Sequence, residues 1–160
     1  MNEESRRLQE KLRAKVSQAL AVSARVKETS IIAFETTTDV LPGSEDLVDR
    51  VVDSLEQSGR VVRRIGKDSP FAAKQDLEGV LDSLGEGIDV VVCEGFGYKP
   101  IPKILVTKKV EEGLNMGLPQ IIGYVADRDA RALIPRFAPD DAKGIARFIE
   151  ENIIGGGING

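Results

Sequence analysis

Residues 88–104, IDVVVCEGFGYKPIPKI, contain the pattern that decides the fold. The continuous apolar run from Val90 to Cys93 is typical of a strand that is buried on both faces, as strands of parallel sheets are. The run ends in an acidic residue, Glu94, and glycines follow it at Gly95 and Gly97. Open α/β sheets bind their ligands beside the carboxyl ends of the strands. The stretch therefore predicts both a parallel α/β sheet and a ligand site at its edge.

Strands and helices alternate along the rest of the chain. Besides the strand at 88–94, we predict strands at 31–34, 60–65, 104–106, 120–125 and 133–134, and helices at 44–59, 70–84, 108–116 and 139–153. We expect Ser44 to cap the first of these helices, with Glu45 and Asp46 in its first turn. The alternation predicts one three-layer α/β/α domain with a mostly parallel sheet, at residues 30–154.

The two ends of the chain differ from this domain. Residues 3–28 carry apolar side chains close to a 3.6-residue period, which predicts an amphipathic helix in an N-terminal segment, residues 1–29. Its apolar face suits packing on the sheet or assembly with another chain. The glycine-rich tail at 155–160, GGGING, is expected to be disordered.

The composition limits the function. The 160 residues are 41% hydrophobic and 30% charged, with a net charge of −4, which suits a soluble domain and argues against a nucleic-acid partner. No apolar run approaches the ~20 residues of a membrane span, and the charged N-terminus lacks the apolar core of a signal peptide. We therefore expect a cytoplasmic protein with no membrane partner.

The chain has no histidine and a single cysteine, Cys93. It therefore has no internal disulfide, no zinc site made of several cysteines and no Ser-His or Cys-His nucleophile pair. The chemistry that remains uses carboxylates, lysines, hydroxyls or a hard metal ion such as Mg²⁺. We assign no catalytic residue.

The loop after the first predicted strand, residues 35–44 with the sequence ETTTDVLPGS, lacks the phosphate-binding motif G-x-x-x-x-G-K-[ST]. When Gly43 is aligned with the last motif glycine, Ser44 occupies the position of the lysine. Four carboxylates lie at or near this helix start and oppose an anion there, those of Glu35, Asp39, Glu45 and Asp46. The loop is either a plain connection or a cation site in which Glu35 and Asp39 hold a metal.

Further candidate ligand residues follow other predicted strands. Lys67 and Asp68 lie in a strand-to-helix turn, where Asp68 or Ser69 can equally cap the next helix. Lys103 follows two rigid prolines and either contacts an anion or is simply a charge on the surface. Asp127 follows the strand at 120–125, where an aspartate binds the donor edge of a guanine base or caps a turn.

Three segments, in this order and spacing, resemble the molybdopterin-guanine dinucleotide biosynthesis protein B family. They are GKDS at 66–69, VVCEGF at 91–96 and PIPKI at 100–104. The resemblance extends over residues 30–153 and implies a P-loop NTPase-like, GTP-binding fold. It also implies ligand-binding roles, residue by residue, for Lys67, Asp68, Glu94, Gly95, Lys103 and Asp127. Members of the family are thought to act as adapters that assist the nucleotidyltransferase in attaching GMP to molybdopterin, often as dimers.

The chain departs from the family pattern at three places. The P-loop has no counterpart, Gly97 stands where the family often has a basic residue, and the helix at 3–28 precedes the usual start of the domain. Three functions remain open. The first is an adapter of molybdenum cofactor biosynthesis whose nucleotide or pterin-type ligand binding is weakened or lost. The second is an active GTPase that holds GTP and Mg²⁺ by non-standard contacts, and the third is a structural or regulatory subunit that assembles through helix 3–28. The implied partners are a molybdenum cofactor nucleotidyltransferase, a molybdoenzyme or a second copy of the chain.

Overall fold

The computed structural model describes residues 3–11, 29–37, 40–127 and 134–154. Within these residues the chain forms one six-stranded sheet in the order β2-β3-β1-β4-β5-β6. The strands are β1 (Ser30–Thr36), β2 (Val62–Ile65), β3 (Val90–Glu94), β4 (Lys103–Val106), β5 (Ile121–Val125) and β6 (Arg136–Phe137). Every described strand pair is parallel, which confirms the predicted α/β class.

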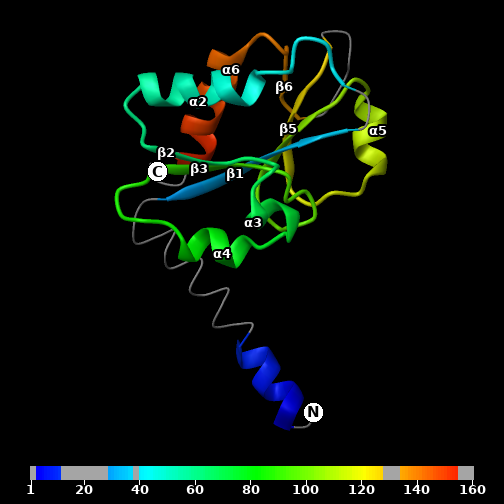
Figure 1. Ribbon diagram of the computed structural model, residues 1–160. Helices are drawn as coiled ribbons and strands as arrows, with labels where there is room; N and C mark the ends of the chain where they lie inside the picture. Colours follow the sequence, from blue (N-terminus) through cyan, green and yellow to red (C-terminus); the bar gives the residue numbers. More distant parts are fainter. Residues whose placement is uncertain (1–2, 12–28, 38–39, 128–133, 155–160) are drawn as a thin grey trace.

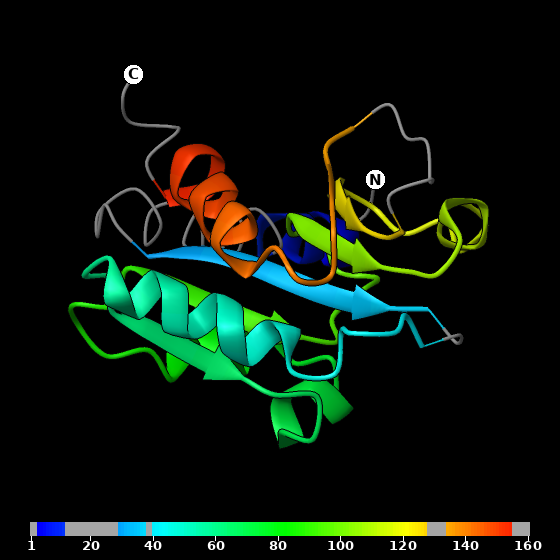
Figure 2. The same ribbon diagram turned by 90° about the horizontal axis from the view of Figure 1, so that it is seen from above.

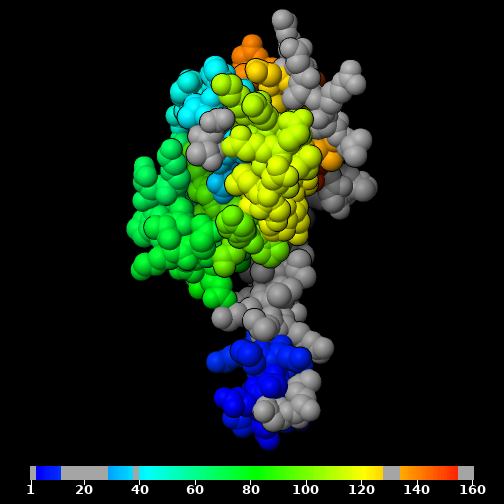
Figure 3. Space-filling model, turned by 90° about the vertical axis from the view of Figure 1, so that its right-hand side faces the viewer, coloured from blue at the N-terminus to red at the C-terminus, as the bar shows by residue number. Residues whose placement is uncertain are grey.

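Helices cover both faces of this sheet and give the three predicted layers. One face carries α2 (Leu47–Gln57) and α6 (Ala142–Ile149), which is followed by a π-helical turn, η1 (Glu150–Ile154) (Figures 1 and 2). The other face carries the shorter helices α3 (Pro70–Ala73), α4 (Leu77–Asp82) and α5 (Val110–Asn115). Figure 3 shows α5, in yellow, at the surface of the molecule.

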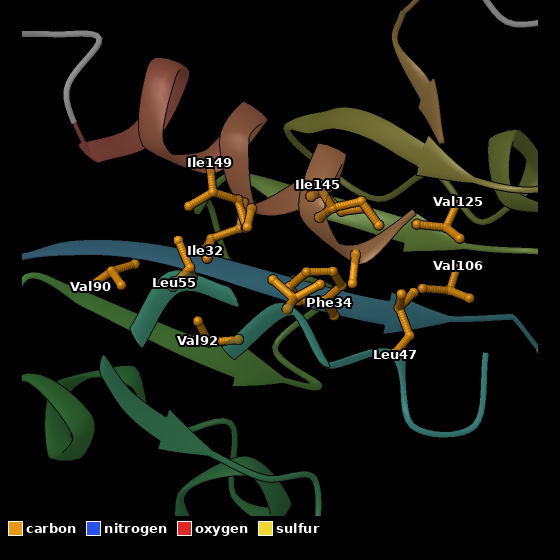
Figure 4. Packing of buried hydrophobic residues seen from close by; sticks show 14 of the residues in the cluster. Ile32, Phe34, Leu47, Leu55, Val90, Val92, Val106, Val125, Ile145 and Ile149 are labelled. Atoms are coloured by element: carbon orange, nitrogen blue, oxygen red, sulfur yellow. The ribbon is translucent and has the colours of Figure 1, made fainter. Parts of the chain in front are cut away.

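The largest apolar core lies between the sheet and the pair α2 and α6. Ile32 and Phe34 of β1 pack there with residues such as Leu55 and Ile145 of the two helices (Figure 4). Ala33, between them in the sequence, points to the opposite face, because side chains alternate along a strand. Glu94 pairs in register with Phe34, so it lies on the α2 face.

The start of α2 differs from the prediction. The helix begins at Leu47 with Asp46 at its N-cap, and the acidic residue of its first turn is Asp49. The carboxylate of Asp46 makes no capping bond because Arg50 binds it, with Arg50 Nε 3.0 Å from Asp46 Oδ1. The Ser44 hydroxyl donates to the carbonyl of Leu41 at 2.6 Å and caps nothing. The predicted Ser44 cap is therefore wrong.

Gly59, the last residue of the helix predicted at 44–59, closes the C-terminal end of α2. Gly59 has a φ of +93°, in the left-handed region that favours glycine. Its N–H donates to the carbonyl of Glu56, and the N–H of Arg60 donates to that of Leu55. This pair of bonds is the Schellman motif that closes many helices.

The single helix predicted at 70–84 is in fact two short helices, α3 and α4. Ser69 accepts a hydrogen bond from the N–H of Phe71 at 3.2 Å with Pro70 in the first turn, which confirms Ser69 as the cap of α3. The break occurs because Gln75 adopts a φ of +53°. Asp76 then caps a new helix by accepting the N–H of Gly79 at 2.9 Å.

The last predicted elements are shifted along the chain. The strand expected at 133–134 is β6, Arg136–Phe137, and the final helix begins at Ala142 rather than at residue 139. Asp141 sets this start, because its carboxylate accepts the N–H of Gly144 at 3.0 Å. The N-cap side chain therefore decides where the helix begins.

The N-terminal segment is helical over residues 3–11, and all these side chains are exposed. Even Leu8 is 59% exposed, so this part of the predicted helix does not pack on the sheet (Figure 3, blue). Residues 12–28 of that helix and the tail at 155–160 lie outside the described residues. Among the described helices, none has the length and apolarity needed to cross a membrane.

Candidate functional site

A cavity of about 510 Å³ lies at the carboxyl ends of β1, β2 and β3, beside the start of α2. Its volume is in the range of small-molecule sites. The chain leaves β1 toward β2 on one side and later crosses from β3 to β4 on the other. Such a change in the direction of the connections is where open α/β sheets bind ligands. The cavity therefore has the position that residues 88–104 predict.

The first glycine after Glu94, Gly95, forms part of the wall of this cavity. Gly95 lines it and has a φ of +91°, and the next residue, Phe96, has a φ of +85°. A left-handed phenylalanine is a strained backbone, and such strain is concentrated at functional sites. The ring of Phe96 is completely buried between the sheet and α3, which holds the loop in this conformation.

Arg64 of β2 is the central cation of the cavity. Its Nη2 lies 2.9 Å from Oε2 of Glu94, and its Nη1 pairs with Oδ1 of Asp49 on α2. Arg64 is in register with Val92 of β3, and therefore lies on the same face of the sheet as Glu94 and α2. One guanidinium thus links three elements that form the cavity: β2, β3 and α2.

The charges around the cavity are predominantly negative. Four carboxylates line it, from Glu35, Glu45, Asp49 and Glu94, against two cations, Arg64 and Lys67. Arg64 is already paired with two of the carboxylates. A triphosphate would meet net negative charge here, in contrast to the cationic cradle of a phosphate-binding loop.

Glu35 and Gly97 are in contact, and both belong to segments that depart from the family pattern. The Glu35 carboxylate accepts hydrogen bonds from the backbone N–H groups of Thr36 and Gly97, and burial raises its pKa. A Cβ at residue 97 would lie 2.4 Å from Glu35 Oε2. A side chain at residue 97 would therefore require Glu35, which lies near the end of β1, to move.

Lys103, predicted to bind an anion, lies outside the cavity and is completely buried. Its ammonium donates to the carbonyls of Lys99 at 3.0 Å, of Ile101 at 2.8 Å and of Pro119. These three bonds use all the donors of the group. Burial lowers the pKa of Lys103, and the nearby carboxylate of Glu35 partly offsets that shift. Lys103 therefore holds the loop that follows Gly95 in place through these hydrogen bonds.

Of the other predicted ligand residues, Lys67 lies at the cavity, whereas Asp68 and Asp127 do not line it. Lys67 lines the cavity together with Glu94 and Gly95, whereas Asp68 is exposed in the turn beside it and is not part of the lining. Asp127 is exposed at the end of β5, separated from β1 by β4. The structure thus brings together Lys67, Glu94 and Gly95 out of the six predicted ligand residues.

The proposed metal site of Glu35 and Asp39 stays a prediction. Asp39 lies outside the described residues. Among the residues that the structure describes, no three histidine, cysteine, aspartate or glutamate side chains come together as metal ligands. Glu35 itself is held by backbone N–H groups.

Sequence reasoning missed Arg64 and Asp49, the partners of Glu94. The signal for Arg64 was its place near the end of a short strand, VVRRI, because the carboxyl ends of parallel strands are where ligand sites form. The signal for Asp49 was less direct, because it depends on where α2 begins. With Asp46 at the N-cap, Asp49 falls in the first helical turn, beside the cavity.

The all-parallel sheet, its two helical layers and a cavity between the end of β1 and the start of α2 define a three-layer α/β/α fold of the P-loop NTPase-like type. Among solved structures, the chain is similar to proteins named MobB. The crystal structure of molybdopterin-guanine biosynthesis protein B matches with a TM-score of 0.62 at 22% identity, over 76% of this chain and 99% of that one. A MobB homologue from Bacillus stearothermophilus matches with a TM-score of 0.59 at 15% identity, over 76% and 96% of the two chains.

Bacillus subtilis MobB also matches, with a TM-score of 0.59 at 13% identity over 77% of this chain and 97% of that one. No protein-family model and no curated protein sequence matches the chain. At such low identity the likeness establishes the fold. The predicted MobB-like, P-loop NTPase-like fold is thereby confirmed.

Proposed function

We propose that this protein is an accessory or adapter protein of molybdopterin guanine dinucleotide biosynthesis, whose own nucleotide or pterin-type ligand binding is weakened at the phosphate loop. The observation that carries the proposal is the cavity at the carboxyl ends of β1 to β3. It has the place of a nucleotide site in a MobB-like fold, but four carboxylates line it and no lysine comes from the loop after β1. A protein with such a site is better suited to assist an enzyme than to hydrolyse GTP.

Three of the residues that the family resemblance assigns to ligand binding lie together, which supports a role in binding a ligand. Glu94, Gly95 and Lys67 line one cavity, although they come from two segments of the sequence. The strained conformation of Gly95 and Phe96 keeps the end of β3 in a fixed shape. At the end of β1 the carboxylate of Glu35 lines the cavity and lies against Gly97, and its negative charge argues against tight binding of a triphosphate.

An active GTPase of the same fold is the second candidate. One observation favours it: two cations, Arg64 and Lys67, line the cavity and lie within reach of an anionic ligand. This candidate requires that a nucleotide displaces the carboxylates that now hold Arg64. It predicts tight GTP binding, whereas the adapter proposal predicts weak binding.

The adapter proposal predicts a complex with the molybdenum cofactor nucleotidyltransferase of the same organism. We expect the mixed proteins to elute as one species with the summed mass by size-exclusion chromatography with light scattering. We also expect GMP transfer to molybdopterin to be faster, or to proceed further, when the protein is present. An unrelated nucleotidyltransferase serves as the control. Separate elution together with an unchanged transfer reaction would overturn the adapter role.

A further inference from the structure

We propose that Arg64 is the anion-binding residue of the cavity, in place of a phosphate-loop lysine, and that Asp49 competes with the anion for its guanidinium. The inference deepens the proposed function, since it rests on the cavity being a ligand site. It assigns the ligand a chemical class: a small molecule that carries a phosphate or pyrophosphate group. It also explains how one carboxylate keeps binding weak.

The position of Arg64 allows it to bind an anionic ligand. The side chain extends from β2 into the cavity and is partly exposed there, so a ligand can reach it. A guanidinium offers a planar fork of N–H donors that fits phosphate oxygens in pairs. Lys67, three residues further along the chain, lines the same cavity and supplies a second positive charge. These two are the basic residues of the lining.

The two carboxylates that hold Arg64 are not equivalent. Glu94, at the end of a buried strand, is only 21% exposed and lies 2.9 Å from Nη2. Asp49, on the surface of α2, is 56% exposed. Ion pairs with exposed partners are weak in water, whereas a pair in a shielded place is harder to replace. Glu94 therefore orients the guanidinium, and Asp49 is the partner that an anion displaces.

The consequence is a built-in competition. While Asp49 pairs with Nη1, the face of the guanidinium toward α2 is neutralised, and an incoming phosphate meets a carboxylate there. Removing the charge of Asp49 leaves Arg64 oriented by Glu94 and free to bind the anion. The change would raise the affinity for phosphate groups without adding any new contact.

Calorimetric titration with inorganic pyrophosphate at low salt tests this inference. We expect Asp49→Asn to bind pyrophosphate about five- to tenfold more tightly than the unchanged protein, because one like charge beside the anion is removed. The matched control is Asp53→Asn, which changes the net charge equally. Asp53 lies one turn further along α2 and lines a separate groove of about 390 Å³. This control should alter the affinity by less than about twofold.

The double variant Asp49→Asn with Arg64→Ala identifies the residue that binds. We expect it to lose the whole increase in pyrophosphate affinity that Asp49→Asn produces. A thermal unfolding transition shows that the double variant remains folded. If Asp49→Asn binds no more tightly than Asp53→Asn, or if the double variant keeps the gain, the inference is overturned. The nucleotidyltransferase complex is measured without pyrophosphate, so a failure of the adapter proposal is visible separately from a failure of this one.

Discussion

Replacing Lys103 with methionine should lower the free energy of unfolding by about 3–5 kcal/mol. Methionine fills much of the volume of the lysine side chain but cannot donate a hydrogen bond. The carbonyls of Lys99, Ile101 and Pro119 would then lose a shared donor at a site that is closed to water. A buried polar group without a partner costs about 1–3 kcal/mol, and three groups are affected.

Urea unfolding followed by circular dichroism measures this loss. Lys108→Met is the matched control, because Lys108 is exposed and lies five residues further along the chain. We expect the control to change the unfolding free energy by no more than about 0.5 kcal/mol. A loss below about 1 kcal/mol for Lys103→Met, on the same scale, would show that the ammonium is not holding the loop.

Replacing Phe96 with alanine should cost about 3–5 kcal/mol, the usual range for a large aromatic side chain removed from a core. The ring is completely buried and packs with Ala33, Cys93 and Ile101. Its removal leaves a void beneath the loop that follows β3. The affinity of the cavity for any ligand should fall as well, because Gly95 precedes Phe96 in the same strained turn.

Phe96→Gly separates the ring from the backbone. In ordinary conformations glycine is less stable than alanine by roughly 0.5–1 kcal/mol. At a φ of +85° alanine carries a strain of about 1–2 kcal/mol that glycine does not. Phe96→Gly should therefore be no more destabilising than Phe96→Ala in the same urea experiment. A glycine variant that is clearly the less stable of the two would contradict the left-handed conformation of this loop.

The fold was predictable because the run from Val90 to Cys93 is typical of a strand covered on both faces, and the alternation of strands and helices along the chain indicates a parallel sheet between two helical layers. Element boundaries were less predictable because side chains competed for the same groups. Arg50 draws Asp46 away from the start of α2, and Gln75 breaks a helix whose apolar pattern continues. Neither the Arg50–Asp46 pair nor the conformation of Gln75 changes the spacing of apolar residues, so neither can be predicted from that spacing.

The site was predictable only in part, for reasons of register. Glu94, Gly95 and Lys67 follow strand ends, and strand ends are visible in the sequence. Lys103 looked equivalent, but it opens β4 next to Ala33 and points to the face opposite Glu94. Arg64 lies in the site because β2 is next to β3 in the sheet. The order of strands in a sheet cannot be predicted from the sequence of one segment.

Calorimetric titration of the protein with GTP, with and without Mg²⁺, tests the central claim most directly. The claim is that this MobB-like cavity, lined by Glu35, Glu45, Asp49 and Glu94 and lacking a phosphate-loop lysine, does not hold a triphosphate tightly. We predict a dissociation constant weaker than about 10 μM, which corresponds to less than roughly 7 kcal/mol of binding free energy, in both conditions. Tighter binding that depends on Mg²⁺ would contradict the claim and establish the chain as a GTP-binding protein with non-standard phosphate contacts.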